Sequence, residues 1–234
     1  MAGFISKQLR DSLKTPLILL GLLWVIQLLQ WLTGIDLGFL GIFPREIPGL
    51  KGILFAPLIH GGFGHLISNS VPFLVLGAMT LFFYPRIARS AFMLIYVLTG
   101  LAVWAFGRQV FHIGMSGVIY GLVAFIFWNG VFRRNLKSVA LAAIVLFYYG
   151  SMLTGILPVQ EDISWESHLL GGLVGIFVSF VYKNRLEKDE VPEKEPTLPM
   201  PDQNYFLDRD TFEEKREPRE AERREFPGWF SDRT

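Results

Sequence analysis

The stretch TPLILLGLLWVIQLLQWLTG, residues 15–34, decides the class of fold because it is predominantly apolar and contains no charged side chain. The hydrocarbon core of a bilayer is about 30 Å thick and requires about 20 such residues in a helix. The stretch is longer than the apolar region of a cleavable signal peptide, so we expect it to stay in the protein. It therefore predicts a transmembrane helix.

Five further apolar stretches follow it. The six predicted spans are residues 15–34, 66–84, 90–107, 115–132, 138–158 and 166–182. Backbone N–H and C=O groups that face lipid must be paired within their own segment, so each span should be a helix. The sequence thus predicts an all-α membrane protein, a polytopic bundle of six transmembrane helices.

Charged residues are distributed unevenly along the 234 residues. Residues 1–182 carry 11 Lys and Arg and 6 Asp and Glu, whereas residues 183–234 carry 11 and 15. This asymmetry is typical of a membrane domain with a solvated tail. We therefore divide the chain into a segment 1–14, a membrane domain 15–182 and a charged tail 183–234. Segment 1–14 is either an interfacial amphipathic helix or a polar tail, and we expect the charged tail to be disordered.

The cations predict which side of the membrane each connection faces, because cytoplasmic connections carry an excess of Lys and Arg. Eleven cations flank the spans on one side, namely Lys7, Arg10, Lys14, Arg86, Arg89, Arg133, Arg134, Lys137, Lys183, Arg185 and Lys188. The other side has only Arg45, Lys51 and Arg108. Both termini are therefore predicted to be cytoplasmic, and residues 35–65, 108–114 and 159–165 to face outward.

The first outer connection, IDLGFLGIFPREIPGLKGILFAPLIHGGFGH (residues 35–65), is unusually apolar. A fully solvated loop would be more polar, so we expect this connection to be partly embedded in the membrane or packed on other spans. His112, in the second outer connection, should be solvated. The chain has no cysteine, which excludes disulfides and thiolate metal sites.

Polar residues of three spans fall near the outer boundary. His65 and Asn69 lie at the start of the second span, Ser116 at the start of the fourth and His168 at the start of the sixth. Polar side chains at membrane depth are costly and usually face the bundle interior or one another. With about 100° per residue in a helix, Ser116 shares a face with Tyr120.

Small residues indicate which spans approach closely. Gly117 and Gly121 form a small-residue stripe on the fourth span. On the sixth span His168 shares one face with three glycines, Gly171, Gly172 and Gly175. Close packing along these surfaces would bring His168 near Ser116, as a serine nucleophile and its general base require.

The residues alone leave other interpretations open. A serine between glycines can serve only helix packing, and a buried histidine can simply bond a backbone carbonyl. His60, His65 and His168 could bind a metal, but that leaves Ser116 unexplained, and we expect no metal and no cofactor. A transporter or channel is disfavoured because the spans show neither a buried charge pair nor an inverted repeat.

Three motifs resemble the signatures of the rhomboid family of intramembrane serine proteases. They are HGGFGHLISN (residues 60–69), GMSG (114–117) and SHLLGGLVG (167–175), in the family's order and on its second, fourth and sixth spans. The resemblance covers roughly residues 15–182. Many members also carry a Trp-Arg pair in the first outer connection, whereas here Arg45 follows a proline, which leaves the fine structure of that connection open.

The resemblance implies a role for each of these residues. Ser116 would be the nucleophile and His168 its general base, with Tyr120 stacked on the histidine ring. His65 and Asn69 would join the Ser116 N–H in the oxyanion hole. Supporting glycines would be Gly114, Gly117, Gly171 and Gly175.

The expected function is hydrolysis of peptide bonds in or near transmembrane segments of other membrane proteins. The alternative is a catalytically silent relative that binds membrane clients. The resemblance implies a multi-pass protein of the bacterial inner membrane, whose partners are the bilayer and protein substrates and not nucleic acid. The sequence does not indicate an oligomeric state.

Overall fold

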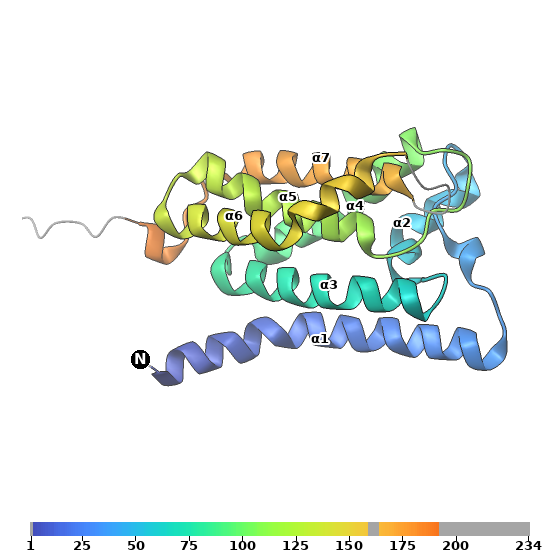
Figure 1. The fold of residues 1–234 in the computed structure, drawn as a ribbon, viewed down its shortest axis with the longest axis horizontal. Helices are drawn as coiled ribbons and strands as arrows, with labels where there is room; N and C mark the ends of the chain where they lie inside the picture. The colour runs from blue at the N-terminus through green and yellow to red at the C-terminus, as the bar shows by residue number, and fades with distance from the viewer. Residues whose placement is uncertain (1, 159–163, 192–234) are drawn as a thin grey trace, which may run out of the picture. The chain divides into compact units, whose positions relative to one another are not determined.

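The computed structural model describes residues 2–158 and 164–191, and within these ranges six helices are long and apolar enough to cross a membrane (Figure 1). They are α1 (Ala2–Thr33), α3 (Phe63–Phe83), α4 (Ala88–Phe106), α5 (Ser116–Arg133), α6 (Leu136–Tyr149) and α7 (Trp165–Tyr182). A 3₁₀ segment, η4 (Gly150–Ile156), extends α6 to the length of a span. The described residues contain no β-strand, only an isolated bridge between Ile42 and His112. The all-α polytopic fold is therefore confirmed.

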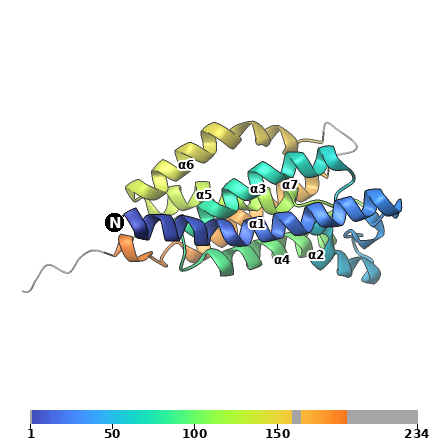
Figure 2. The same cartoon turned by 90° about the horizontal axis from the view of Figure 1, so that it is seen from below.

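Helix α5 forms the centre of the bundle. Half of its residues are buried, against about a sixth of those in α1 and in the α6–η4 span. It packs most extensively against α7 and α6, while α1 lies along α3 on the outside of the bundle, as both views show (Figures 1 and 2). Leu122, Phe125 and Ile126 of α5 are fully buried in the main apolar core. The central helix is thus the one that begins with Ser116.

Helices α5 and α7 run parallel, with their glycines in register. A Cβ atom on Gly171 would collide with the carbonyl oxygen of Gly117, and one on Gly175 with that of Gly121. The predicted close packing of these two helices is therefore present. Gly172 differs from the prediction, because a Cβ atom there would meet open space, so this glycine faces away from the contact.

The N-terminal segment is not a separate element. Helix α1 begins at Ala2 and continues through Pro16 to Thr33, so residues 2–14 form neither an independent interfacial helix nor a polar tail. The Nε2 group of Gln8 donates a hydrogen bond to the carbonyl oxygen of Phe82 at 2.9 Å, which ties the first turns of α1 to the end of α3.

The first outer connection folds into short helical turns. They are η1 (Gly38–Leu40), η2 (Ile47–Lys51), α2 (Gly52–Phe55) and η3 (Ala56–Leu58). Ile42 and Ala56 are buried on the bundle, as expected of a packed connection, whereas Ile47 is 80% exposed. Arg45 fastens the connection to the end of α4, since its backbone N–H donates to Trp104 O and its guanidinium to Gly107 O. Embedding of the exposed apolar side in a membrane stays a prediction.

The start of the charged tail also departs from the prediction. Residues 183–191 are folded against the end of the bundle and include the turn η5 (Lys188–Glu190). Arg133 and Glu190 form an ion pair of 2.6 Å, with side chains that are 0% and 3% exposed. Two carboxylates of this segment, Asp189 and Glu190, therefore have cationic partners on the bundle, and that of Glu187 accepts the backbone N–H of Arg86, which charge counting alone does not reveal. The rest of the tail lies outside the described residues.

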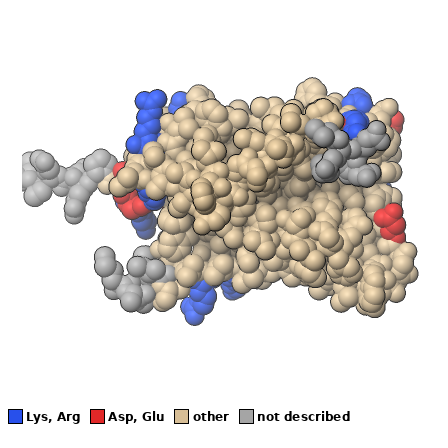
Figure 3. Space-filling model, in the orientation of Figure 1, with Lys and Arg blue, Asp and Glu red and all other residues tan. Residues whose placement is uncertain are grey.

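Charged side chains gather at the two ends of the bundle. On the face drawn in Figure 3, Lys, Arg, Asp and Glu occupy both ends and leave a broad uncharged band between them. A band of this kind is what a surface in contact with hydrocarbon requires, because a charged side chain at the bilayer centre is costly.

Candidate active site

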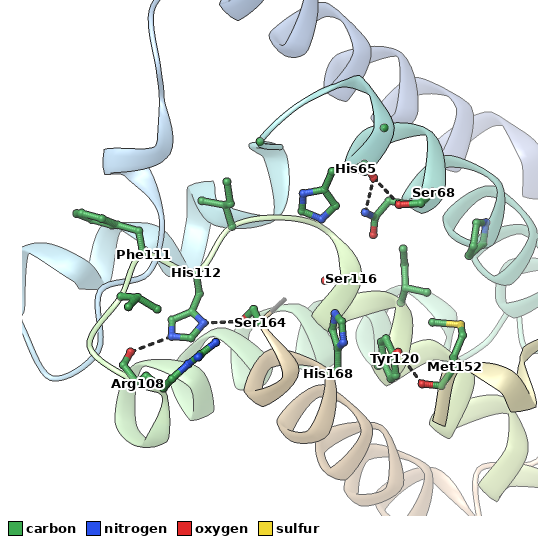
Figure 4. Close-up of a pocket in the computed structure, with 17 residues that line it drawn as sticks. His65, Ser68, Arg108, Phe111, His112, Ser116, Tyr120, Met152, Ser164 and His168 are labelled. Atoms are coloured by element: carbon green, nitrogen blue, oxygen red, sulfur yellow. Dashed lines mark hydrogen bonds between the residues drawn. The ribbon is translucent and has the colours of Figure 1, made fainter. Parts of the chain in front are cut away.

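A cavity of about 860 Å³ opens where α3, α5 and α7 begin, at the end of the bundle remote from the start of α1. All five residues to which the sequence assigned direct roles line it, namely His65, Asn69, Ser116, Tyr120 and His168. Figure 4 shows His65, Ser116, Tyr120 and His168 converging from the three helices, with the imidazole of His168 beneath Ser116 in that view. The residues that the sequence predicted to lie at a similar depth therefore lie close together in space.

Ser116 is the first residue of α5, directly after a turn that only glycine adopts easily. Gly114 has a φ of +104°, and its N–H donates to Ala56 O at 2.9 Å. The first N–H groups of a helix have no partner within the helix and carry partial positive charge. The Ser116 N–H is thus available beside its own hydroxyl to stabilise a developing negative charge.

His168 is held by two contacts that together define its tautomer. Its Nδ1 lies 2.8 Å from the carbonyl oxygen of Gly155, which only accepts, so Nδ1 carries the proton. The Nε2 lone pair then remains to accept a hydroxyl proton. The ring stacks on Tyr120 with centroids 4.2 Å apart and planes within 7°. The Tyr120 hydroxyl in turn donates to Met152 O at 2.7 Å.

No sequence signal pointed to Gly155 or Met152. Both act through backbone carbonyls, which every residue possesses, so residue type says nothing about this role. Gly155 has a steric reason to be glycine, because a Cβ atom there would collide with the Tyr120 hydroxyl. Glu166, two residues before His168, pairs with Arg108 at 2.6 Å.

His65 and Asn69 occupy the side of the cavity formed by α3. Asn69 donates one amide hydrogen from Nδ2 to His65 O at 2.7 Å, which leaves the second for another acceptor. The His65 ring lies against the backbone of Gly114, where a Cβ atom would come within 2.7 Å of Cε1. The glycine before Met115 therefore makes room for an imidazole beside the Ser116 turn.

His60 supports this arrangement from behind. Its ring meets that of His65 edge to face at 5.0 Å, and its Nε2 accepts the N–H of Met115 at 3.4 Å. Burial, and then the proximity of His65, lower the pKa of His60 to about 4, so the ring is neutral near pH 7. Among the described residues no three His, Asp or Glu side chains form a group that could hold a metal ion.

The solvated position predicted for His112 is wrong. This side chain is only 2% exposed and bonds to Ser164 and to the backbone of Arg108. Its residue type and its place in a short loop gave no indication of these partners, because Ser164 is 52 positions away in the sequence.

The model of the Rhomboid domain matches residues 49–185, more than half of the chain. The chain belongs to the rhomboid family. The matched range contains all five residues that converge on the cavity. Together with its six apolar helices, this membership makes the chain an integral multi-pass membrane protein.

Relatives of this rhomboid occur in bacteria. An uncharacterised protein of Mycobacterium tuberculosis is 37% identical over 177 residues, which cover 71% of this chain and 73% of the relative. A Mycobacterium leprae protein is 33% identical over 71% of this chain and 70% of its own. YdcA of Bacillus subtilis, whose name proposes a rhomboid protease, is 27% identical over 56% of this chain and 66% of its own.

Proposed function

We propose that this rhomboid is an intramembrane serine endopeptidase that hydrolyses peptide bonds in or near transmembrane segments of other membrane proteins. The observation that carries the proposal is the setting of His168. Stacking on Tyr120 and the bond to Gly155 orient its ring, with a bare Nε2, in the cavity that Ser116 lines.

The reaction follows from the groups present. The Ser116 Oγ attacks the scissile carbonyl carbon while Nε2 of His168 takes the hydroxyl proton. The carbonyl oxygen gains negative charge, which the Ser116 N–H, the second Asn69 amide hydrogen and His65 stabilise. The proton on Nε2 then passes to the leaving nitrogen as the C–N bond breaks. Water attacks the resulting ester, with His168 again as base, and restores the free serine.

Position in the membrane supports a transmembrane substrate. The cavity lies at the outer end of the bundle if the cation-rich end is cytoplasmic, as the distribution of Lys and Arg favours. We infer that both termini face the cytoplasm, in the inner membrane of a bacterium, and that cleavage occurs near the outer ends of substrate helices.

A catalytically silent, client-binding protein is the second candidate. Such a protein has no need of a serine at a helix N-terminus or of an oriented histidine, and this chain keeps both. The presence of the complete set of groups therefore favours the enzyme.

The deciding experiment measures cleavage of a reporter transmembrane segment by the purified protein in proteoliposomes. Ser116→Ala and His168→Ala should each abolish cleavage. Ser90→Ala provides a matched control, because Ser90 is an exposed serine near the start of α4, at the opposite end of the bundle. A fluorophosphonate should label Ser116 and no other serine. Undiminished cleavage by both alanine variants would refute the mechanism.

Asn69 can be tested separately. Loss of one oxyanion donor typically costs about 10²–10³ in turnover. We expect Asn69→Ala to lower kcat by this amount and to change KM little, since the bond forms mainly in the transition state. An unchanged kcat would remove Asn69 from the oxyanion hole.

A further inference from the structure

His112 is buried and both of its ring nitrogens are paired, although the proposed mechanism gives it no role. Its Nε2 lies 3.0 Å from the carbonyl oxygen of Arg108, and its Nδ1 lies 2.5 Å from the Ser164 hydroxyl. Its own backbone is fixed by the two hydrogen bonds that it exchanges with Ile42. Gly107 leaves room for the ring, since a Cβ atom there would lie 2.9 Å from Nε2.

These contacts determine the direction of a chain of hydrogen bonds. The Arg108 carbonyl only accepts, so Nε2 of His112 carries the proton and Nδ1 has a free lone pair. The Ser164 hydroxyl must therefore donate to Nδ1. Its oxygen is then left to accept from the Ser167 hydroxyl, which lies 2.6 Å away. The Nδ1 atom of His112 is therefore the final acceptor in this series of hydrogen bonds.

This series of hydrogen bonds joins the segment that precedes the nucleophile to the helix that carries the base. His112 comes four residues before Ser116, and Ser164 and Ser167 form the first turn of α7, directly before His168. Ser164 is the N-cap of α7, but its side chain makes no cap hydrogen bond to the backbone and instead bonds His112 and Ser167. The first turn of α7 is thus held by another segment of the chain.

The same turn contacts α5 directly. A Cβ atom on Gly117 would lie 3.1 Å from the carbonyl oxygen of Ser167, so the backbones of the two helices meet one residue from Ser116 and one from His168. The ion pair between Arg108 and Glu166 adds a second link between the same two segments. These contacts connect His112 to the two reacting side chains over a single helical turn.

We propose that His112 is a positioning residue, which through Ser164 and Ser167 sets the placement of His168 relative to Ser116. The inference rests on the proposed protease function and concerns the geometry of that same site. His112 and Ser164 also line the cavity, but in this role His112 acts through Ser164 and Ser167, so its loss affects the chemical step more than binding.

The experiment compares steady-state cleavage of the reporter segment by five variants. His112→Leu removes the acceptor, and Ser164→Ala removes the hydroxyl that donates to it. Each should lower kcat by about 10²-fold and leave KM within about twofold, because a misplacement of about 1 Å at the reacting atoms costs about this much. The double variant should be no slower than the slower single variant, since both remove one shared interaction.

His112→Asn and Gln109→Ala provide the controls. The asparagine side-chain oxygen can take the place of Nδ1 as acceptor, so this variant should keep kcat within about fivefold of the wild type. Gln109 is exposed in the same loop and does not line the cavity, so its replacement should change neither constant. The unfolding midpoint, measured in parallel, shows which variants remain folded. If His112→Leu does not fold, Ser164→Ala and His112→Asn decide the question.

Three results would overturn the inference. They are wild-type turnover by Ser164→Ala or a folded His112→Leu, a rise in KM with unchanged kcat, and multiplicative losses in the double variant. Fluorophosphonate labelling separates these from a failure of the proposed function. If the wild type itself neither cleaves the reporter nor is labelled at Ser116, the protease proposal is wrong, and this inference, which depends on it, is wrong as well.

Discussion

Replacement of Gly171 by alanine tests whether the backbone contact between α5 and α7 sets the geometry of the site. The new Cβ atom would collide with the carbonyl oxygen of Gly117, and non-bonded carbon and oxygen atoms pack at about 3.5 Å, so the helices must separate by about 1 Å or more. Gly172→Ala is a matched control, because its Cβ atom meets nothing within 4 Å. The intrinsic helix preference of alanine over glycine applies to both variants and cancels in the comparison.

The difference between the two variants therefore measures the collision. Overpacking of this kind costs typically about 1–3 kcal/mol, so Gly171→Ala should unfold more easily than Gly172→Ala by that amount. Gly171 lies one turn from His168, and a shift of about 1 Å should also lower kcat by about 10²-fold. Unfolding in mixed micelles and cleavage of the reporter segment measure the two effects. Equal stability and equal kcat of the two variants would refute the reasoning.

Two further predictions concern buried charged or titratable groups. Arg133→Met should lower the free energy of unfolding by up to about 3 kcal/mol, because it removes the shorter of the two ion pairs of buried Glu190 and leaves Lys137, at 3.1 Å, as its cationic partner. A double variant with Glu190→Gln should lose less than the sum of the single losses, and additive losses would argue against the pair. His60 should make stability depend on pH, since its pKa is about 4 in the folded state and 6.5 in the unfolded chain. Below pH 6.5 the unfolded chain binds a proton that the folded protein does not, so the free energy of unfolding should fall by about 3 kcal/mol between pH 6.5 and 4. The difference between wild type and His60→Asn over this range isolates the effect, and a flat difference would contradict it.

The parts of the fold that sequence predicts are those governed by the membrane. The lengths of the six spans follow from bilayer thickness, and five predicted spans match their observed helices with ends shifted by a few residues, whereas the first helix begins at Ala2, well before the predicted start at residue 15. The convergence of Ser116, His65 and His168 could be predicted because a helical segment that enters from a known side has a known depth at every residue. Helical phase also identified Gly171 and Gly175 as contact residues, and missed only the outward direction of Gly172.

The parts that sequence does not predict depend on pairing between distant segments. The backbone carbonyls of Gly155 and Met152 orient His168 and Tyr120. Every residue has such a carbonyl, so the residue type does not reveal which one acts as the acceptor. His112 was expected to be solvated because it lies in a short loop, and its burial depends on Ser164 and Ile42. The folded segment 183–191 has the composition of a solvated tail, and it packs because Arg86, Arg133 and Lys137 lie at the end of the bundle.

Three regions that hold α7 against α5 and the loop before it should differ in what they control. At the outer end the hydrogen bonds of His112 hold the first turn of α7, and in the middle the glycine backbones meet. At the inner end Arg133 of α5 donates to Tyr182 O, the last residue of α7, at 3.1 Å. Backbone contacts in the middle do not compress, so they keep the outer ends in register when the inner contact is lost. Arg133→Met should therefore lose stability at nearly unchanged kcat, whereas His112→Leu should lose kcat at nearly unchanged stability, and the opposite pattern would show that this division of roles is wrong.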